Sequence, residues 1–179
     1  MEIKKTSLYQ LHKNNNAKFV EFAGYEMPIQ YDRGIIEEHK FTREHSGIFD
    51  VSHMGQLFIY GDENLTKDLE KIFPVDLKNL ELNSSKYSFL MNSEAGIYDD
   101  LIITKIEGGY IIILNAACKD NDHKILSKLL LNKYDMSLDE SRSLIAIQGP
   151  DSKDILEKLI SELLKQKDLR TMHTRIHCL

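Results

Sequence analysis

The stretch Gly96-Ile97-Tyr98-Asp99-Asp100-Leu101-Ile102-Ile103 places two adjacent carboxylates directly before an apolar run. The residues from Leu101 to Ile103 are typical of a buried strand, so the acidic pair lies where a solvent-facing loop becomes core. Neighbouring carboxylates at such a border repel each other and lose hydration unless donors or a cationic ligand compensate. Asp99 and Asp100 are therefore a candidate functional site, and the alternative is an ordinary acidic turn that caps a strand.

The segments on either side of this stretch predict a mixture of hairpins and single helices. Strands are expected at residues 19–22, 48–51, 56–60, 87–91, 101–106, 110–114 and 143–147, and helices at residues 6–13, 34–45, 65–72, 122–133 and 152–164. Gly108-Gly109 makes a hairpin of the two strands beside it. Because strands and helices do not alternate regularly, the sequence predicts an α+β fold with largely antiparallel sheets.

The predicted helices carry further local signals. Thr6 or Ser7 is expected to cap the first helix through its hydroxyl. The last two helices have apolar stripes at helical spacing, formed by Ile125, Leu126, Leu129 and Leu130 and by Ile155, Leu156, Leu159 and Ile160. We expect both stripes to be buried, because an amphipathic helix turns its apolar face towards a core.

Length and composition restrict the classes of function. The chain has 179 residues, which suits one medium domain or two small interleaved ones. Its net charge of -5 and its lack of a lysine or arginine cluster argue against nucleic acid as a partner. No apolar run approaches the roughly 20 residues that span a bilayer, and residues 1–5 lack the apolar stretch of a signal peptide. Cys118 and Cys178 form no CxxC pair, which favours a reducing, cytoplasmic setting.

Four further segments gather residues that suit neither a simple core nor a simple surface. They are Phe22–Pro28, Phe49–Gly55, Lys86–Asn92 and Leu114–Ala117. The first is a glycine and aromatic turn, which could place a ring against a flat ligand. In the second, Asp50 and His53 suggest a metal, but two ligands without a third or fourth are insufficient, and no metal is expected. Instead, we expect His53 to cap or to bond to backbone in that turn.

The other two segments leave alternatives open. The alternation in Lys86–Asn92 places Tyr87, Phe89 and Met91 on one side of the strand. These side chains either pack into the core or line a heteroaromatic pocket. Asn115 ends a strand and offers a donor and an acceptor together, and the small residues after it would let a ligand approach the backbone. Cys118 is either a nucleophile or a half-buried structural thiol.

Taken in order, five segments resemble the aminomethyltransferase family of the glycine cleavage system, whose members are also called T-proteins. The resemblance is carried by Phe22-Ala23-Gly24-Tyr25-Glu26-Met27-Pro28, Phe49-Asp50-Val51-Ser52-His53-Met54-Gly55, Gly96-Ile97-Tyr98-Asp99-Asp100-Leu101-Ile102, Asn115-Ala116-Ala117-Cys118 and Ala146-Ile147-Gln148-Gly149-Pro150. It extends without large gaps from about Thr6 to Leu164.

The resemblance implies a transferase that takes an aminomethyl group from the lipoyl arm of the H-protein, releases ammonia and passes the one-carbon unit to tetrahydrofolate. It implies that Asp100 is the catalytic residue, which orients the folate and assists the attack of its nitrogen by hydrogen bonding and charge. It also implies that Met54, Tyr87, Asp100 and Asn115 contact the folate, with Asp99 as a supporting neighbour. The expected partners are lipoylated H-protein and tetrahydrofolate, with no nucleic acid and no membrane.

The resemblance further implies two interleaved lobes. The outer lobe is expected at residues 1–54 and 141–168, the inner folate-binding lobe at 55–140, and an atypical polar tail at 169–179. Family members are longer, and after the segment that ends at Pro150 they continue into further folate ligands and a C-terminal domain. We therefore expect weak folate binding and little transfer by this chain. The alternative is a non-catalytic folate-binding module, or a fragment that a second chain completes.

Overall fold

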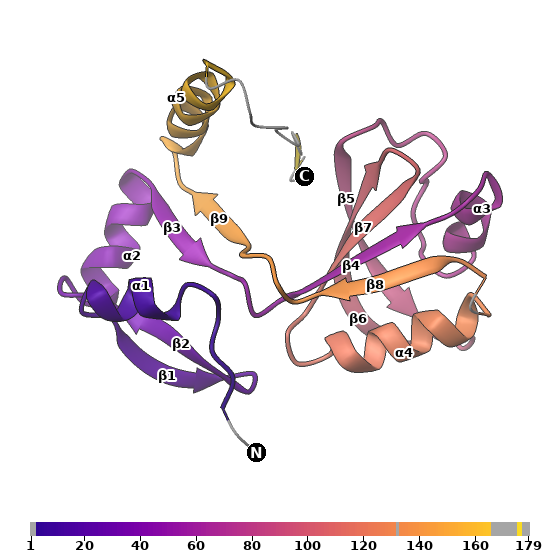
Figure 1. Cartoon of the computed structure of the whole chain (residues 1–179), viewed down its shortest axis with the longest axis horizontal. Helices are drawn as coiled ribbons and strands as arrows, with labels where there is room; N and C mark the ends of the chain where they lie inside the picture. Colours follow the sequence, from indigo (N-terminus) through magenta and orange to yellow (C-terminus); the bar gives the residue numbers. More distant parts are fainter. Residues whose placement is uncertain (1–2, 132, 166–174, 177–179) are drawn as a thin grey trace. The chain divides into compact units, whose positions relative to one another are not determined.

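The computed structural model describes residues 3–131, 133–165 and 175–176 of the chain (Figure 1). The expected α+β class with largely antiparallel sheets is confirmed. Apart from residues 175–176, the tail expected at 169–179 lies outside the described residues. Within the described residues, no helix combines the length and the apolar character that crossing a membrane requires.

Most elements lie where the hydrophobic pattern places them. The helices are α1 (Tyr9–Asn14), α2 (Ile35–Glu44), α3 (Asn64–Glu70), α4 (Lys119–Leu129) and α5 (Ser152–Lys165). The strands are β1 (Lys18–Phe22), β2 (Tyr25–Gln30), β3 (Gly47–Asp50), β4 (Gly55–Tyr60), β5 (Ser84–Met91), β6 (Ile97–Ile106), β7 (Gly109–Leu114), β8 (Asp135–Asp139), β9 (Ile145–Gln148) and β10 (Arg175–Ile176).

The sequence did not predict β2, β8 or the two-residue strand β10. Strand β2 contains Pro28, and a proline within an apolar run argues against a central strand. Here β2 pairs with β1 in a two-stranded hairpin, with one further parallel bridge between Tyr25 and Lys4, and a proline is tolerated at such an edge. The turn between them is Ala23-Gly24, and both residues have positive φ, at 50° and 77°. The glycine and aromatic segment is thus a hairpin. Strand β8 holds only two apolar residues, too few for its pattern to stand out from a loop.

The chain divides into two compact units. Among the described residues, the first unit holds residues 3–53 and 141–165, and the second holds residues 54–140 and 175–176. The first unit contains the hairpin β1-β2 and the antiparallel pair β3-β9. The second contains a six-stranded sheet in the order β10-β5-β6-β7-β4-β8, antiparallel throughout except for the β10-β5 pair.

The second unit has a continuous hydrophobic core on one face of its sheet. The core consists of Leu57, Ile59, Leu65, Leu69, Phe73, Leu77, Leu80, Leu90, Leu101, Ile103, Tyr110, Ile112, Leu114, Leu126 and Leu130. Because side chains alternate along a strand, the intervening residues form the opposite side, which we call the open face. It carries Tyr87, Phe89, Asp100, Ile102 and Ile113, all exposed or half-buried.

Helix α4 covers part of the core with an unexpected stripe. It begins at Lys119 rather than at Asp122, and it buries Lys119, Asp122 and Leu126. The expectation of a buried Leu129 is wrong, because that side chain is 49% exposed. The longer helix places Lys119 and Asp122 on the turns before Leu126, on the same side of the helix.

The first unit buries far less apolar surface. None of the residues of α2 is buried, and its Ile36 is 70% exposed. The stripe expected to be buried on α5 is exposed at Ile155, Leu156 and Leu159, so that prediction is wrong for these three residues; the side chain of Ile160 lies outside the described part of the chain. The helix forms where its periodicity predicts, but its apolar face stays partly exposed.

Candidate functional site

Strand alternation in β6 separates the two acids of the sequence pair. Asp99 lies opposite Leu90 and is 9% exposed, so it shares the face of the core. Asp100 lies opposite Phe89 and is exposed on the open face. The pair therefore consists of one buried acid and one accessible acid, and of the two carboxylates only that of Asp100 projects from the open face.

The side chain of Asn115 connects the two acids. Asn115 follows directly after β7, and its predecessor Leu114 pairs with Leu101 of β6. Its Nδ2 donates to Oδ1 of Asp99 at 2.9 Å, to the backbone oxygen of Asp100 at 3.1 Å and to Oδ1 of Asp100 at 3.3 Å. One amide group thus fixes the buried carboxylate and the accessible one in relation to each other.

Tyr87 supports Asp100 from the neighbouring strand. It is the diagonal neighbour of Asp100, because Phe89 pairs with Asp100 and Tyr87 pairs with Ile102. A hydrogen bond to the Asp100 carboxylate is the main reason why the pKa of Tyr87 is raised, and the tyrosine hydroxyl is the donor. The rings of Tyr87 and Phe89 meet edge to face at 5.3 Å between centroids. Since Tyr87 is 59% exposed, the interpretation of this face as core is wrong.

Met54 lies at the same edge of the sheet. It directly precedes β4, whose first residue Gly55 pairs with Leu114. Because Leu114 also pairs with Leu101, the register aligns Met54, Asn115 and Asp100 on three adjacent strands. The structure therefore brings these three predicted site residues together, with Tyr87 two positions along the next strand.

A second buried acid lies beside Asp99, and sequence reasoning missed it. Asp122, in the first turn of α4, is 1% exposed. Burial, a hydrogen bond with Asp99 and the charge of Asp99 raise the pKa of Asp122 to about 7. The expected helix began at Asp122, where an acid is a normal solvent-exposed first residue. Its spacing of four from Leu126 was the signal for an inward position.

Cys118 lies next to this acidic cluster. Burial raises the pKa of its thiol, and the charges of Asp99, Asp122 and Asp100 raise it further. A thiol in such surroundings stays protonated at neutral pH, whereas a nucleophilic cysteine requires an electropositive setting. The interpretation of Cys118 as a structural thiol is therefore favoured.

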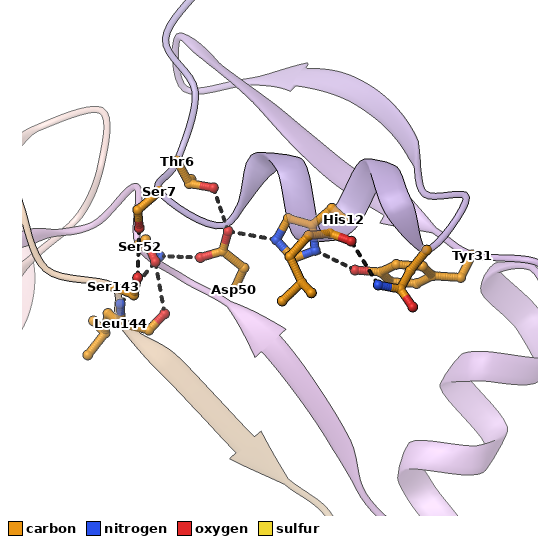
Figure 2. Close-up of polar contacts among 10 residues, drawn as sticks. Thr6, Ser7, His12, Tyr31, Asp50, Ser52, Ser143 and Leu144 are labelled. Atoms are coloured by element: carbon orange, nitrogen blue, oxygen red, sulfur yellow. Dashed lines mark hydrogen bonds and ion pairs between the residues drawn. The ribbon is translucent and has the colours of Figure 1, made fainter.

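A separate polar cluster holds the first unit together (Figure 2). The Asp50 carboxylate accepts hydrogen bonds from Thr6 Oγ1 at 2.7 Å and from the backbone N–H of Ser52 at 2.9 Å. Its Oδ2 lies 2.8 Å from Nε2 of His12, whose Nδ1 lies 2.6 Å from the hydroxyl of Tyr31. Burial raises the pKa of Asp50, but the hydrogen bonds from Ser52, Thr6 and His12 outweigh it and lower that pKa below its usual value.

These contacts concern two points of the sequence analysis: the expected hydroxyl cap of the first helix, and the suggestion of a metal at Asp50 and His53. Helix α1 begins at Tyr9 without a side-chain cap, because the hydroxyl of Thr6 donates to Asp50 instead. The ring of His53 packs edge-on against Phe22 at 5.7 Å between centroids. The carboxylate of Asp50 instead accepts hydrogen bonds from Thr6 and Ser52. Among the residues that the structure describes, no group of three or more His, Cys, Asp or Glu is arranged to hold a metal ion.

The residues around Asp100 on the open face suit a particular kind of ligand. Asp100 presents a carboxylate held by the Asn115 amide, beside the rings of Tyr87 and Phe89. A fixed carboxylate accepts hydrogen bonds from the polar edge of a planar ligand and stabilises positive charge that develops near it. The aromatic rings suit a flat heteroaromatic body.

Comparison with known proteins gives a consistent result. The sequence matches the family described as the GCVT N-terminal domain over residues 8–177. The mitochondrial aminomethyltransferase of Dictyostelium discoideum is 41% identical over an aligned region that covers 96% of this chain and 43% of that protein. The aminomethyltransferase of Flavobacterium psychrophilum is 41% identical over 161 residues, which cover 89% of this chain and 44% of that protein.

A solved structure is also similar. The glycine cleavage system aminomethyltransferase T from Bartonella henselae, determined by crystallography, matches with a TM-score of 0.83 at 34% sequence identity. The match covers 98% of this chain and 50% of that one. This chain thus spans about half the length of the proteins that it resembles.

Proposed function

The chain belongs to the GCVT N-terminal domain family, and on that premise we propose that it supplies the folate-binding part of an aminomethyltransferase of the glycine cleavage system. In this proposal the one-carbon unit passes from aminomethyl-lipoyl H-protein to tetrahydrofolate, with release of ammonia. The observation that supports it most directly is the accessible carboxylate of Asp100, which Asn115 and Tyr87 orient on the open face.

Asp100 is proposed as the catalytic residue. Its carboxylate accepts hydrogen bonds from the pterin edge and holds the reactive nitrogen towards the incoming carbon. The same negative charge stabilises the cationic, iminium-like carbon that forms as the thioether sulfur departs with its bonding electron pair. Neither role requires a covalent bond between Asp100 and the substrate.

Asn115, Tyr87 and Met54 are proposed as folate-binding residues. The Asn115 amide holds Asp100 before any ligand arrives, so the carboxylate needs little reorganisation during the reaction. The ring of Tyr87 offers a flat apolar surface for a heteroaromatic ligand. The thioether of Met54 is polarizable and suits the same kind of contact. In this proposal residues 55–140 form the folate-binding lobe.

The binding proposal is tested by calorimetry with tetrahydrofolate. We expect weak binding by the 179-residue chain, a further loss in Asp100→Asn, and no change in Asp120→Asn, which alters an exposed acid of α4. The proposal that this chain alone has little activity is tested separately, by ammonia release from aminomethylated H-protein. Tight folate binding together with rapid ammonia release would contradict the proposed impairment, and equal binding by the Asp100 variant would remove that residue from the site.

A second candidate function is a fragment that another polypeptide completes. It is favoured by the exposed apolar residues of the first unit, which are Ile35, Ile36 and Phe41 on α2, Ile48 and Phe49 on β3, Ile145 on β9, and Ile155, Leu156 and Leu159 on α5. Exposed apolar surface of this extent marks an interaction site. Since the relatives are about twice as long, the proposed occupant is a polypeptide equivalent to their second half.

Light scattering tests this second candidate. The second half of the Flavobacterium psychrophilum relative, supplied as a separate chain, is expected to form a one-to-one complex. The double change Ile36→Asp and Leu156→Asp should abolish the complex, whereas Glu37→Gln, at an exposed polar position of α2, should preserve it. Absence of a complex, or a complex that tolerates the double change, would contradict the proposal.

The compartment is also a proposal. The cysteine usage favours a cytoplasmic setting, while the relative from Dictyostelium discoideum is named as a mitochondrial protein. Both compartments keep thiols reduced, which agrees with the free thiol of Cys118. Fluorescence microscopy of the tagged chain in its own cells distinguishes the two.

A further inference from the structure

Asp122 is a buried acid to which the proposed transfer assigns no role. Its side chain lies in the core of the second unit, and neither of its carboxylate oxygens receives a hydrogen bond from an N–H group or a hydroxyl of the described residues. The same is true of Oδ2 of Asp99. A polar side chain buried in this way carries a large desolvation cost unless it finds a partner.

Asp99 is the group whose hydrogen bond and charge act on Asp122. Two ionised carboxylates in contact within a core would repel each other, so one of them must hold a proton. The proton converts an acceptor into a donor, and Asp122 then donates to Asp99. The raised pKa of Asp122 agrees with a proton held between the two acids.

We propose that Asp122 is a positioning residue, whose carboxylic acid fixes Asp99 on the core face so that Asp99 and Asn115 set the orientation of Asp100 on the open face. The connection is continuous. Asp122 donates to Asp99, whose Oδ1 accepts from Nδ2 of Asn115 at 2.9 Å, and the same Nδ2 lies 3.3 Å from Oδ1 of Asp100. The hydrogen-bonded chain passes from one face of the sheet to the other at the ends of β6 and β7.

The groups around Asp122 make this connection sensitive to pH. They are Asp99 on β6 and Cys118, the residue directly before α4, whose first residue Lys119 is also buried. The Nζ of Lys119 lies 2.7 Å from Oε1 of Glu140, so its charge is already paired with another acid. Loss of the Asp122 proton therefore places two negative charges in contact, and Asp99 can no longer hold the same position. We expect the Asn115 amide and the Asp100 carboxylate to shift together with it.

The side-chain amide of Asn115 provides a direct readout, which NMR can follow without substrate. In the native chain its amide signals are expected to move with pH, with a midpoint near 7. Asp122→Asn keeps a donor to Asp99 but cannot ionise, so its signals should stay at the low-pH position of the native chain from pH 5 to 9. Asp120→Asn, on the exposed side of α4, should reproduce the native curve.

Removal of the donor gives the complementary test. Asp122→Ala should shift the Asn115 signals at every pH and weaken tetrahydrofolate binding about tenfold, whereas Asp122→Asn should remain within about twofold of the native chain. Should Asp122→Ala fail to fold, the comparison of the native chain with Asp122→Asn decides the question. Asn115 signals that stay constant from pH 5 to 9 in the native chain, or equal behaviour of the Asn and Ala variants, would overturn the proposal.

This inference rests on the proposed function only for its effect on folate. A chain that binds no folate but shows the Asn115 titration would retain the positioning network and lose the proposed ligand. A chain that binds folate with constant Asn115 signals would retain the ligand and lose the network. The two failures are therefore distinguishable.

Discussion

Asp99 and Asp100 are neighbours in the chain, yet their carboxylates lie on opposite faces of the same sheet. Asp99 is 9% exposed and shares its face with the hydrophobic core, while Asp100 is exposed beside Tyr87. The amide of Asn115 contacts both. The accessible acid is thereby held by an arrangement of buried groups, and a change in the core reaches the open face through a single side chain.

Asp100→Asn should leave folding intact and remove transfer. Because Asp100 is exposed, the change should move the melting temperature by no more than a few degrees. Loss of a preorganised charge beside the reacting carbon should lower the transfer rate about 100-fold or more. The measurement is 5,10-methylenetetrahydrofolate formation by the chain completed with the second half of a relative. Transfer at the native rate would exclude Asp100 from the mechanism.

Asn115→Ala should destabilise the second unit. The substitution leaves Oδ1 of the buried Asp99 without its donor, and an unsatisfied buried group costs about 1–3 kcal/mol. Urea unfolding gives the free energy of unfolding directly. Asn121→Ala, at an exposed position of α4, is the matched control and should change stability by less than about 0.5 kcal/mol. Equal effects of the two substitutions would mean that the Asn115 hydrogen bonds contribute nothing to stability.

Asp122 should make stability fall as pH rises. Its pKa in the folded chain is about 7, above the ordinary value of 3.8, so the folded state binds the extra proton. The stabilising contribution is complete below about pH 4 and is lost as pH rises through 7, with a total of up to about 4 kcal/mol. Urea unfolding at pH 5 and pH 8 should show this loss in the native chain but not in Asp122→Asn. Parallel pH profiles of the two proteins would contradict the buried proton.

Asp50 should have the opposite pH dependence in the first unit. Its pKa is lowered in the folded chain, so its contribution to stability is present above the ordinary value of 3.8 and is lost as pH falls through the folded value. Asp50→Asn disrupts a buried cluster with His12 and Thr6, and we expect a loss of about 3 kcal/mol or more at pH 7.

A second histidine–aspartate pair serves as the control for Asp50. His45 and Asp151 lie 3.3 Å apart, and both side chains are more than half exposed. Asp151→Asn should therefore cost less than about 1 kcal/mol, since exposed pairs contribute little. A comparable loss in both variants would show that burial does not determine the strength of the Asp50 cluster.

Local pattern was a good guide to the secondary structure. The apolar runs at residues 101–106 and 110–114, joined by Gly108-Gly109, predict the hairpin β6-β7 that the structure contains. The stripe on α5 likewise predicts its helix, but not whether the stripe is covered. Whether an apolar face is buried depends on segments far away in the chain, or on another chain, and periodicity carries no information about them.

In the candidate site, too, local sequence predicted some features and long-range packing decided the others. The sequence by itself predicted a buried strand next to the acidic pair, because apolar residues and alternation act locally, and it indicated Asp100, Met54, Tyr87 and Asn115 through the resemblance. The strand in fact begins earlier, at Ile97, and includes both acids. Only the tertiary structure decided that Asn115 joins Asp99 to Asp100 and that Asp122 lies against Asp99. These contacts depend on the register of β6 with β7 and on where α4 begins. Both are set by packing in the core, which brings distant segments together.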